Sequence, residues 1–335
     1  DTDRSRGLGD VYKETAVENQ IFYNQIITDN QIDTIIYQDS YYLNECLLFN
    51  TPNRNSIKII CVEHSAPNNG LISVHQALKK NPWYNFYAYA KIAYFHGLGI
   101  LKTRKRKQQL YAYCDKYVVL SSGYVPIFIK MNHITKTDKI EVIENPISLP
   151  LQNKVSTKEK ICLFIGRFTS TKGIFHLLNI WKSIEQTPCC NEWKLIMVGD
   201  GEQRKEIETY IYTNQLKRIQ LEGFKKEVAP YYQKASIFLM TSIFEGFPLT
   251  LPEAMGNGTV PIAFNSFAAI PDIITPDIDG ILIPPFDEKL FTVRLISLMK
   301  DTNERKRLAE NALKKAQNFS QPTIWTKWDK LLENE

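Results

Sequence analysis

Two glutamates, Glu245 and Glu253, are the first candidates for chemistry, and seven residues separate them. The apolar run 237–240 before them predicts a buried strand, and a short helix is predicted from Thr250 to Gly256. Glu245 stands among aromatic and glycine residues where no hydrophobic periodicity requires a carboxylate, which favours a functional role. Glu253 has an alternative, because Thr250 and Glu253 have the spacing of a capping box, which satisfies amides at a helix start and contributes ~1 kcal/mol.

Two cations, Arg167 and Lys172, follow the apolar run 160–166, which predicts a strand of a parallel sheet covered on both faces. A helix is predicted directly after Gly173. Doubly wound folds bind ligands at the carboxyl ends of their strands, and two cations beside a helix N-terminus make an anion site. The alternative is that both side chains are simply solvated, as most loop cations are. Their position in a chain that also carries the glutamate pair favours the anion site.

His64 comes directly after the predicted strand 57–62. A lone histidine at a strand end is more often structural than catalytic, so its position alone predicts little. The other four histidines have no comparable setting and are interpreted as structural.

The segment 79–107 is basic and aromatic. No acidic residue occurs between Glu63 and Asp115, whereas that interval holds eight lysines and arginines and nine aromatic residues. This composition suits an anionic membrane surface, where each basic residue adds ~1 kcal/mol and aromatic residues lie at headgroup level. An alternative is an aromatic core helix followed by a solvated basic loop. Nucleic-acid binding is a weaker third hypothesis, because no recognised module accompanies the patch.

Gly199 and Gly201 follow the predicted strand 193–198 and raise a different hypothesis. Together with Arg204 they match half of a dinucleotide-binding fingerprint, and Glu222 follows at about the distance expected of a ribose ligand. The third glycine is missing, and the motif lies far from the start of a domain. An NAD-dependent oxidoreductase is therefore the weaker alternative.

Length and composition indicate a soluble protein of two domains. The chain has 335 residues, of which 44% are hydrophobic and 23% charged, and its formal net charge of +5 does not by itself imply a nucleic-acid partner. The six cysteines are scattered without metal-site spacing, which predicts buried reduced thiols in a cytosolic protein. No apolar run approaches the ~20 residues that cross a bilayer. Asp277 and Asp279 lie beside Gly280 in a proline-rich turn, so we interpret them as turn residues.

Strands and helices are predicted to alternate along the chain, which indicates an α/β fold. The polar run 152–158 marks a linker between two halves. The first ~30 residues look helical, although a doubly wound domain should begin with a strand, so we expect one or two strand–helix units upstream of Asp1. Strands are expected at 33–37, 57–62, 116–120, 139–143, 160–166, 193–198, 219–224, 237–240 and 260–263, and a turn followed by a strand is expected at 279–283.

Three motifs in the second half resemble those of the family 4 glycosyltransferases, which are retaining enzymes of the GT-B fold. They are Gly166-Arg167 followed by Lys172-Gly173, the pair Glu245 and Glu253 (Glu-x7-Glu), and the run 198–201 (Val-Gly-Asp-Gly). The resemblance covers most of the chain and is strongest at 162–283. It implies two Rossmann-like doubly wound domains that face each other across a cleft. These are an acceptor-side domain at 1–150, truncated at its start, and a nucleotide-sugar-binding domain at 151–321, with 322–335 crossing back to the first.

The same resemblance implies a role for each candidate residue. Glu253 is expected to bind the ribose hydroxyls, and Glu245 to hold hydroxyls of the transferred sugar. Arg167 and Lys172 are expected to stabilise the leaving diphosphate, and His64 to face the donor from the other domain. The catalytic set is thus Glu245, His64, Arg167 and Lys172. The donor-binding set is Gly166, Arg167, Lys172, Gly199, Gly223, Phe224, Glu245, Gly246, Phe247, Pro248, Leu249, Thr250 and Glu253.

The predicted function is that of a retaining glycosyltransferase in polysaccharide or glycoconjugate biosynthesis. It moves a sugar from a UDP- or GDP-linked donor to a saccharide or a lipid-linked saccharide. No cofactor or metal is expected, because the two cations and the helix N-terminus after Pro248 supply positive charge. We expect a cytoplasmic location that includes the inner face of the plasma membrane, with membrane contact through 79–107 and no nucleic-acid partner. A non-catalytic partner subunit of the same fold is a further alternative.

Overall fold

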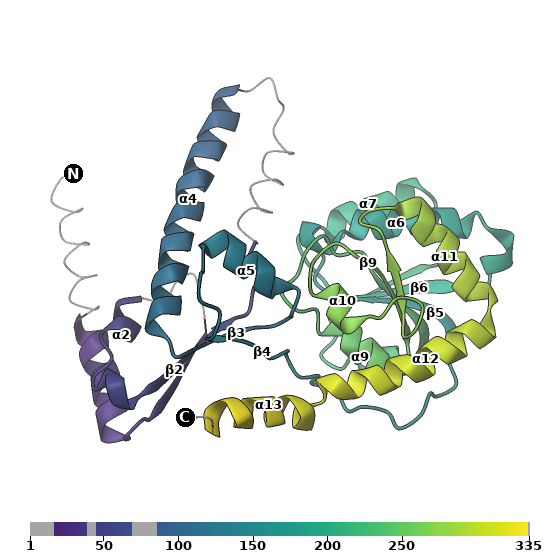
Figure 1. Cartoon of the computed structure of the whole chain (residues 1–335). Coiled ribbons are helices and arrows are strands. Elements are labelled where there is room, and N and C mark those ends of the chain that lie inside the picture. Colours follow the sequence, from purple (N-terminus) through teal and green to yellow (C-terminus); the bar gives the residue numbers. More distant parts are fainter. Residues whose placement is uncertain (1–16, 39–44, 69–85, 334–335) are drawn as a thin grey trace. The chain divides into compact units, whose positions relative to one another are not determined.

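The computed structural model describes residues 17–38, 45–68 and 86–333 (Figure 1). The chain folds into two compact units. The N-terminal unit comprises Asp1–Val119 and Val125–Val142, and the C-terminal unit comprises Leu120–Tyr124 and Ile143–Glu335. The predicted boundary at residue 150 and the predicted grouping of 322–335 with the first domain, which differ from this division, stay predictions.

The N-terminal unit holds a four-stranded parallel sheet in the order β1-β2-β3-β4. Each strand agrees with its expected range to within one residue at either end. Alternate side chains of β2 and β3, among them Ile59 and Tyr117, enter one core together with Phe128 of α5. The strands are β1 (Thr34–Gln38), β2 (Lys58–Glu63), β3 (Lys116–Val119) and β4 (Ile140–Val142), and the helices are 17–29, α2 (Glu45–Phe49), α4 (Phe86–Tyr113) and α5 (Tyr124–Asn132).

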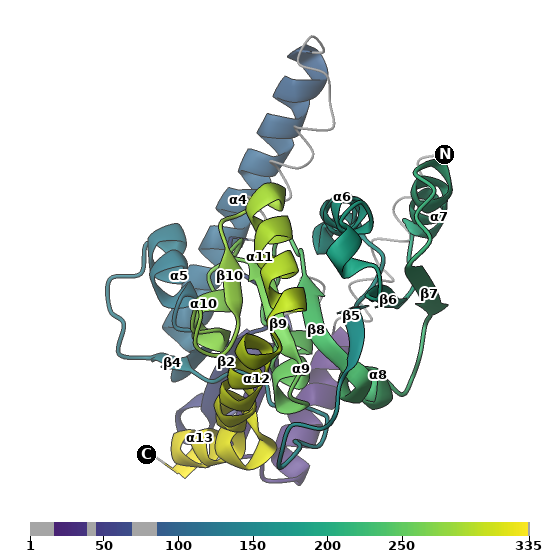
Figure 2. The same cartoon turned by 90° about the vertical axis from the view of Figure 1, so that its right-hand side faces the viewer.

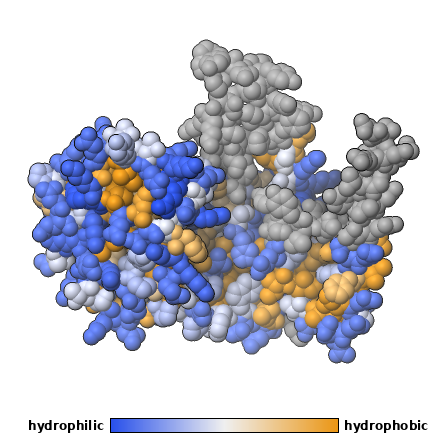
Figure 3. Space-filling model, turned by 180° about the vertical axis from the view of Figure 1, so that it is seen from behind, coloured by the Kyte–Doolittle hydropathy of each residue, from blue (hydrophilic) through white to orange (hydrophobic). Residues whose placement is uncertain are grey.

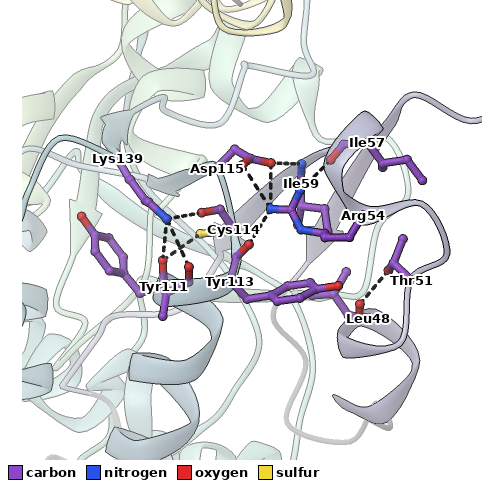
Figure 4. Close-up of polar contacts among 11 residues, drawn as sticks. Leu48, Thr51, Arg54, Ile57, Ile59, Tyr111, Tyr113, Cys114, Asp115 and Lys139 are labelled. Carbon is purple, nitrogen blue, oxygen red and sulfur yellow. Dashed lines mark hydrogen bonds and ion pairs between the residues drawn. The ribbon is translucent and has the colours of Figure 1, made fainter.

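Arg54 connects the starts of β2 and β3 to the end of α4, and Lys139 connects the start of β4 to it (Figure 4). The Arg54 guanidinium forms an ion pair with Asp115 at 3.0 Å, and the Ile59 amide donates to the same carboxylate at 2.7 Å. Burial alone would raise the pKa of Asp115, but these two bonds lower it below its usual value. The Lys139 ammonium donates to the Cys114 carbonyl at 2.6 Å, so it satisfies a carbonyl just past the helix end.

The basic run near the end of α4 is largely used inside the N-terminal unit. Lys107 forms an ion pair with Glu63, and these side chains are only 4% and 1% exposed. The Tyr117 hydroxyl donates to the same carboxylate at 2.9 Å. Arg104 donates to the Met131 carbonyl at 2.8 Å. Since 102–107 belongs to a helix, the expectation of a solvated basic loop is wrong for these residues.

The C-terminal unit holds a six-stranded parallel sheet in the order β10-β9-β8-β5-β6-β7 (Figure 2). In chain order the first three strands extend from the centre to one edge and the next three to the other, which is the strand order of the Rossmann fold. The order reverses between β5 and β8, and such a switch point is where these sheets bind ligands. The strands are β5 (Glu159–Ile165), β6 (Lys194–Val198), β7 (Ile219–Gly223), β8 (Ala235–Met240), β9 (Val260–Phe264) and β10 (Ile281–Ile283), all within two residues of expectation.

Helices cover both faces of this sheet. Every residue of β8 is buried, as expected for a strand of a covered parallel sheet. Ile237 and Leu239 face the core that contains α6 and α11, whereas Phe238 packs against Tyr232 of α8 on the other side. The helices are α6 (Ile174–Glu185), α7 (Arg204–Thr213), α8 (Ala229–Lys234), α9 (Thr250–Gly256), α10 (Ile270–Ile273), α11 (Glu288–Lys300), α12 (Thr302–Ala316) and α13 (Gln321–Glu333).

Five cysteines have described side chains, and all five are free thiols. Four of them are buried, and burial raises the pKa of the Cys162 thiol, which keeps it protonated and unreactive. Cys189 is exposed, so the expectation of buried thiols is wrong for this residue.

Apolar side chains are exposed on the first described helix, residues 17–29. Four of them, Val17, Ile21, Phe22 and Ile26, are between 42% and 64% exposed. Figure 3 colours hydrophobic residues orange and shows where they reach the surface on one side of the molecule. Within the ranges that the structure describes, no helix combines the length and apolar character needed to cross a bilayer.

We expect Lys107→Met to lower the free energy of unfolding by about 3–5 kcal/mol, because the substitution leaves the buried Glu63 carboxylate without its cation. Lys105→Met is the matched control on the same helix, since Lys105 is exposed, and its effect should stay within about 0.5 kcal/mol. Urea unfolding followed by circular dichroism measures both values. Equal stability of the two variants would contradict a stabilising role for the buried pair.

Candidate active site

The loop after β5 carries the two predicted phosphate-binding cations. Arg167 is exposed, and Lys172 ends a short 3-10 turn (Ser170–Lys172). Gly173 follows with φ 60°, and a Cβ on it would lie 2.1 Å from the Thr241 carbonyl oxygen, so only glycine fits. Gly173 is also the N-cap of α6 and provides no side-chain cap. The positive end of the helix dipole therefore lies beside Lys172.

The loop after β8 carries Glu245, and it is joined directly to the first loop. The Lys172 ammonium lies 2.8 Å from Glu245 Oε2, and the two side chains are 18% and 15% exposed. The Ser242 hydroxyl donates to Glu245 Oε1 at 2.6 Å. The Ile243 amide donates to the Thr171 carbonyl at 2.8 Å, which ties the two backbones together. The structure therefore brings together Lys172 and Glu245, which are far apart in the sequence.

These two loops leave the sheet at its switch point, since β5 and β8 are the neighbouring strands where the order reverses. Parallel strands bring the carboxyl ends of β5 and β8 to the same edge of the sheet. Lys172 supplies a positive charge at this edge and Glu245 an acceptor that is already oriented. The arrangement can bind a ligand that has both an anionic group and hydroxyl groups.

Tyr124 was not predicted and contacts the same loop from the segment Leu120–Tyr124 of the C-terminal unit. Its hydroxyl donates to the main-chain carbonyl of Glu245. Burial raises the pKa of Tyr124, and the Glu245 carboxylate adds to this effect, so the phenol stays protonated and remains a donor. Ser121 of the same segment donates to Asp272 of α10 at 2.6 Å. No sequence pattern connects these residues, because their partners lie more than a hundred positions away.

Glu253 is not a helix cap, so the capping-box alternative is wrong. The N-cap of α9 is Leu249, which makes no side-chain cap, and among the described residues the buried Thr250 hydroxyl finds no hydrogen-bond partner. The Glu253 carboxylate instead accepts from the Ser148 hydroxyl and from the Tyr232 hydroxyl, each at 3.0 Å. Burial raises the pKa of Glu253, and these two bonds oppose the shift.

The glycines after β6 serve close packing between two loops. A Cβ on Gly199 would lie 1.9 Å from the Gly166 carbonyl oxygen, and one on Gly201 would lie 2.6 Å from the Phe168 carbonyl oxygen. The Gly199 amide donates to the Gly223 carbonyl at 2.9 Å. Gly166, Gly199 and Gly223 therefore follow neighbouring strands at one edge of the sheet, and the dinucleotide-like spacing has a packing explanation.

The remaining predicted residues occupy varied settings. Phe247 and Pro248 are buried, and the Phe247 ring lies 5.8 Å from that of Phe319, whereas Phe224 is 78% exposed at the end of β7. His64 follows β2 in the N-terminal unit and is exposed. The donor-binding and catalytic roles of these residues, and those of Gly246, Leu249 and Thr250, stay predictions.

Asp277 and Asp279 are turn residues, as interpreted from the sequence. The Asp279 carboxylate accepts from the Thr275 amide at 2.7 Å, and Asp277 forms an ion pair with Arg294 of α11. Across the described part of the chain, no group of three or more histidine, cysteine, aspartate or glutamate side chains could hold a metal ion.

A cavity of about 680 Å³ lies elsewhere in the C-terminal unit, between the linker and α12. It touches Ser236 and Val260, which are at the amino ends of β8 and β9. Doubly wound sheets bind ligands at the opposite edge, so we place the candidate active site at the loops after β5 and β8.

Residues 149–315 match the sequence model of the family described as glycosyl transferases group 1. This segment is therefore similar in sequence to members of that family. Residues 149–315 contain every strand of the C-terminal sheet and both glutamates of the candidate site. The comparison therefore favours a glycosyltransferase over an NAD-dependent oxidoreductase.

Two named relatives are similar to about two thirds of the chain. The amylovoran biosynthesis glycosyltransferase AmsD of Erwinia amylovora is 29% identical over 234 residues, which are 68% of this chain and 65% of that protein. The GalNAc-α-(1→4)-GalNAc-α-(1→3)-diNAcBac-PP-undecaprenol α-1,4-N-acetyl-D-galactosaminyltransferase of Campylobacter jejuni is 27% identical over 228 residues, which are 66% of this chain and 61% of that protein.

Solved glycosyltransferases share the fold of the whole chain. The pneumococcal O-GlcNAc transferase GtfA aligns with a TM-score of 0.69 and 16% identity, over 94% of this chain and 60% of that one. The fold is GT-B, as predicted from the motifs. The chain spans less than two thirds of the length of these three proteins.

We expect Gly199→Ala to lower the free energy of unfolding by about 1–3 kcal/mol, because the added Cβ would overlap the Gly166 carbonyl oxygen and force the two loops apart. Gly166→Ala is the matched control in the same contact, since its Cβ would make only ordinary contacts at 3.5 Å or more. Thermal unfolding followed by calorimetry compares the two. The packing explanation fails if Gly199→Ala unfolds at the temperature of the native protein.

Proposed function

We propose that the chain is a retaining glycosyltransferase of family 4 that transfers a hexose or N-acetylhexosamine from a nucleoside diphosphate sugar. The observation that carries the proposal is the contact between Lys172 and Glu245 at the switch point of the C-terminal sheet. It joins a diphosphate-binding cation to an acceptor for sugar hydroxyls within one site. The family of residues 149–315 supports the same activity.

The names of the relatives support the donor and acceptor classes. AmsD is named for the biosynthesis of amylovoran, and the Campylobacter jejuni enzyme is named for transfer to an undecaprenyl-diphosphate-linked saccharide. The pneumococcal enzyme was solved in complex with UDP and GlcNAc. We propose a UDP-linked donor, with GDP as the alternative, and a saccharide or lipid-linked saccharide acceptor in polysaccharide or glycoconjugate biosynthesis.

The negative charge on the leaving diphosphate is the main charge that the site has to stabilise. When the glycosidic bond to the donor breaks, negative charge builds on the diphosphate while the sugar becomes oxocarbenium-like. Arg167 and Lys172 would each contribute ~1.5–3 kcal/mol through charge-assisted hydrogen bonds, out of the ~8–23 kcal/mol that an enzyme supplies. The open start of α6 adds positive potential. These groups would support a metal-independent reaction.

The surroundings of Glu245 favour retention by departure on one face of the sugar. A double displacement needs a free carboxylate that attacks the anomeric carbon. Glu245 has one carboxylate oxygen paired with Lys172 and the other bonded to Ser242. We therefore assign Glu245 to orienting sugar hydroxyls and Glu253 to the ribose. The role of His64 toward the donor stays a prediction.

One face of α4 supports a proposal of membrane contact. Leu98 and Leu101 are 40% and 56% exposed, and Lys102 and Lys105 are exposed at the spacing that places all four on one side of the helix. Apolar residues beside lysines suit an anionic membrane surface. Such contact would bring a lipid-linked acceptor to a cytoplasmic enzyme at the inner face of the plasma membrane.

We expect Lys172→Ala to weaken the binding of UDP by about 10- to 100-fold, because one charge-assisted hydrogen bond to the diphosphate is lost. Lys154→Ala is the control, since Lys154 is an exposed lysine of the linker. Isothermal titration with UDP and with GDP measures the affinities, and nucleotide release from a panel of UDP- and GDP-sugars identifies the donor. Undiminished affinity in Lys172→Ala would refute the assigned diphosphate site.

We expect the double variant Lys102→Gln/Lys105→Gln to bind anionic vesicles about 30-fold more weakly, since each basic residue near such a surface contributes ~1 kcal/mol. Sedimentation with phosphatidylcholine vesicles, with and without phosphatidylglycerol, measures the binding. Lys306→Gln/Lys314→Gln is the matched control, because it removes the same charge from exposed positions of α12. Equal loss in both double variants would show a general charge effect and contradict contact through α4.

A further inference from the structure

We propose that Tyr232 and Ser148 are positioning residues for the donor ribose, because their hydroxyls hold the two oxygens of Glu253 in one orientation. The inference rests on the proposed function and deepens it. Tyr232 is on α8 and Ser148 is in the segment that leads from the last strand of the first sheet to β5. Neither residue belongs to a motif in the sequence, and both reach Glu253 only through the fold.

Tyr232 is fully buried, and its place is determined by contacts at both ends. The hydroxyl donates to Glu253 Oε2 at 3.0 Å. The ring packs against Phe238 at 5.8 Å between centroids. Its main-chain carbonyl accepts from Thr259 at 2.6 Å and from Lys158 at 3.0 Å. A buried tyrosine hydroxyl needs a partner, and a side chain held in this way presents its hydroxyl at one point.

Ser148 is exposed, but the segment that carries it is hydrogen-bonded on both sides of it. The Ile147 amide donates to the Phe319 carbonyl at 2.8 Å, and the Gln152 amide donates to the Gly256 carbonyl at 2.9 Å. Leu151 packs so closely on α9 that a Cβ on Gly256 would lie 2.3 Å from its side chain. The Ser148 hydroxyl therefore donates to Glu253 Oε1 from a fixed position, at 3.0 Å.

The two hydroxyls determine what Glu253 can bind. Each carboxylate oxygen has two acceptor positions, and one on each oxygen is used by Ser148 or Tyr232. The second position on each oxygen remains for two neighbouring hydroxyls, as on a ribose. A site built to bond a hydroxyl rejects the analogue that lacks it, because a buried acceptor is then left unpaired. The geometry therefore favours ribonucleotides over 2′-deoxyribonucleotides.

The same two bonds keep Glu253 in the form that accepts. Burial raises the pKa of Glu253, and the hydroxyls of Ser148 and Tyr232 lower it again. Only the ionised carboxylate can accept from Ser148, Tyr232 and two ribose hydroxyls at once, so donor binding should fall as the pH falls through this pKa. Loss of either hydroxyl lets the pKa rise further, and the fall in binding should then begin at a higher pH.

The test compares Tyr232→Phe and Ser148→Ala with the native full chain by isothermal titration with UDP and with 2′-deoxy-UDP. The titrations are made between about pH 5 and about pH 8, a range that lies above the usual pKa of a glutamate and so suits one whose pKa is raised. Each variant should bind UDP about 3- to 10-fold more weakly at neutral pH and lose much of its preference for UDP over 2′-deoxy-UDP. Its UDP affinity should also begin to fall at a higher pH than that of the native chain. Tyr210→Phe is the control, since it removes a tyrosine hydroxyl that bonds Asn179 on the surface of the same unit.

The outcomes separate the two proposals. If the native chain binds neither UDP nor GDP, the proposed function fails, and with it the role of Glu253 toward a ribose. If the native chain binds UDP but both variants keep its affinity, its acid limb and its preference for the ribose, the positioning inference alone is overturned. A melting curve of each variant shows whether it folds. If Tyr232→Phe does not fold, Ser148→Ala tests the positioning inference by itself, because Ser148 is exposed and its replacement leaves the core unchanged.

Discussion

The ion pair between Lys172 and Glu245 is the interaction on which the candidate site depends. It crosses from the loop after β5 to the loop after β8, at the place where the strand order of the C-terminal sheet reverses. Both side chains are mostly shielded from water, so their attraction is stronger than that of a surface pair, and each would be costly to leave without a partner. The pair thus keeps two loops with opposite charges in one place before any ligand arrives.

Hydroxyl groups around the two glutamates complete this arrangement. Ser242 bonds Glu245, while Ser148 and Tyr232 bond Glu253. Each hydroxyl donates to one carboxylate oxygen and leaves the negative charge in place. Both glutamates can therefore still accept hydrogen bonds from a ligand, and their carboxylates are held in one orientation. A ligand that enters such a site does not need to reorient the acceptors, which reduces the entropic cost of binding.

Two of the corrections to the sequence-based expectations share one cause. Thr250 and Glu253 have capping-box spacing, but the carboxylate bonds Ser148 and Tyr232, which are distant in sequence. Residues 102–107 look like a solvated basic loop, but Lys107 finds the buried Glu63 across the N-terminal unit. In each case a long-range partner outweighed a local pattern, and no spacing rule reports such partners.

The sequence by itself determined the strands of both sheets, the GT-B fold, the positions of Arg167, Lys172 and Glu245 in loops after strands, and that of Glu253 on the following helix. Hydrophobic runs and loop chemistry are local, so they can be seen along the chain. Only the tertiary structure decided that Lys172 lies against Glu245, that Gly199 must pass the Gly166 carbonyl, and that Tyr232 and Ser148 orient Glu253. The first two contacts join residues that meet because parallel strands bring their carboxyl ends to one edge of the sheet. Tyr232 on α8 and Ser148 before β5 meet Glu253 because the fold packs together segments that lie far apart in the sequence.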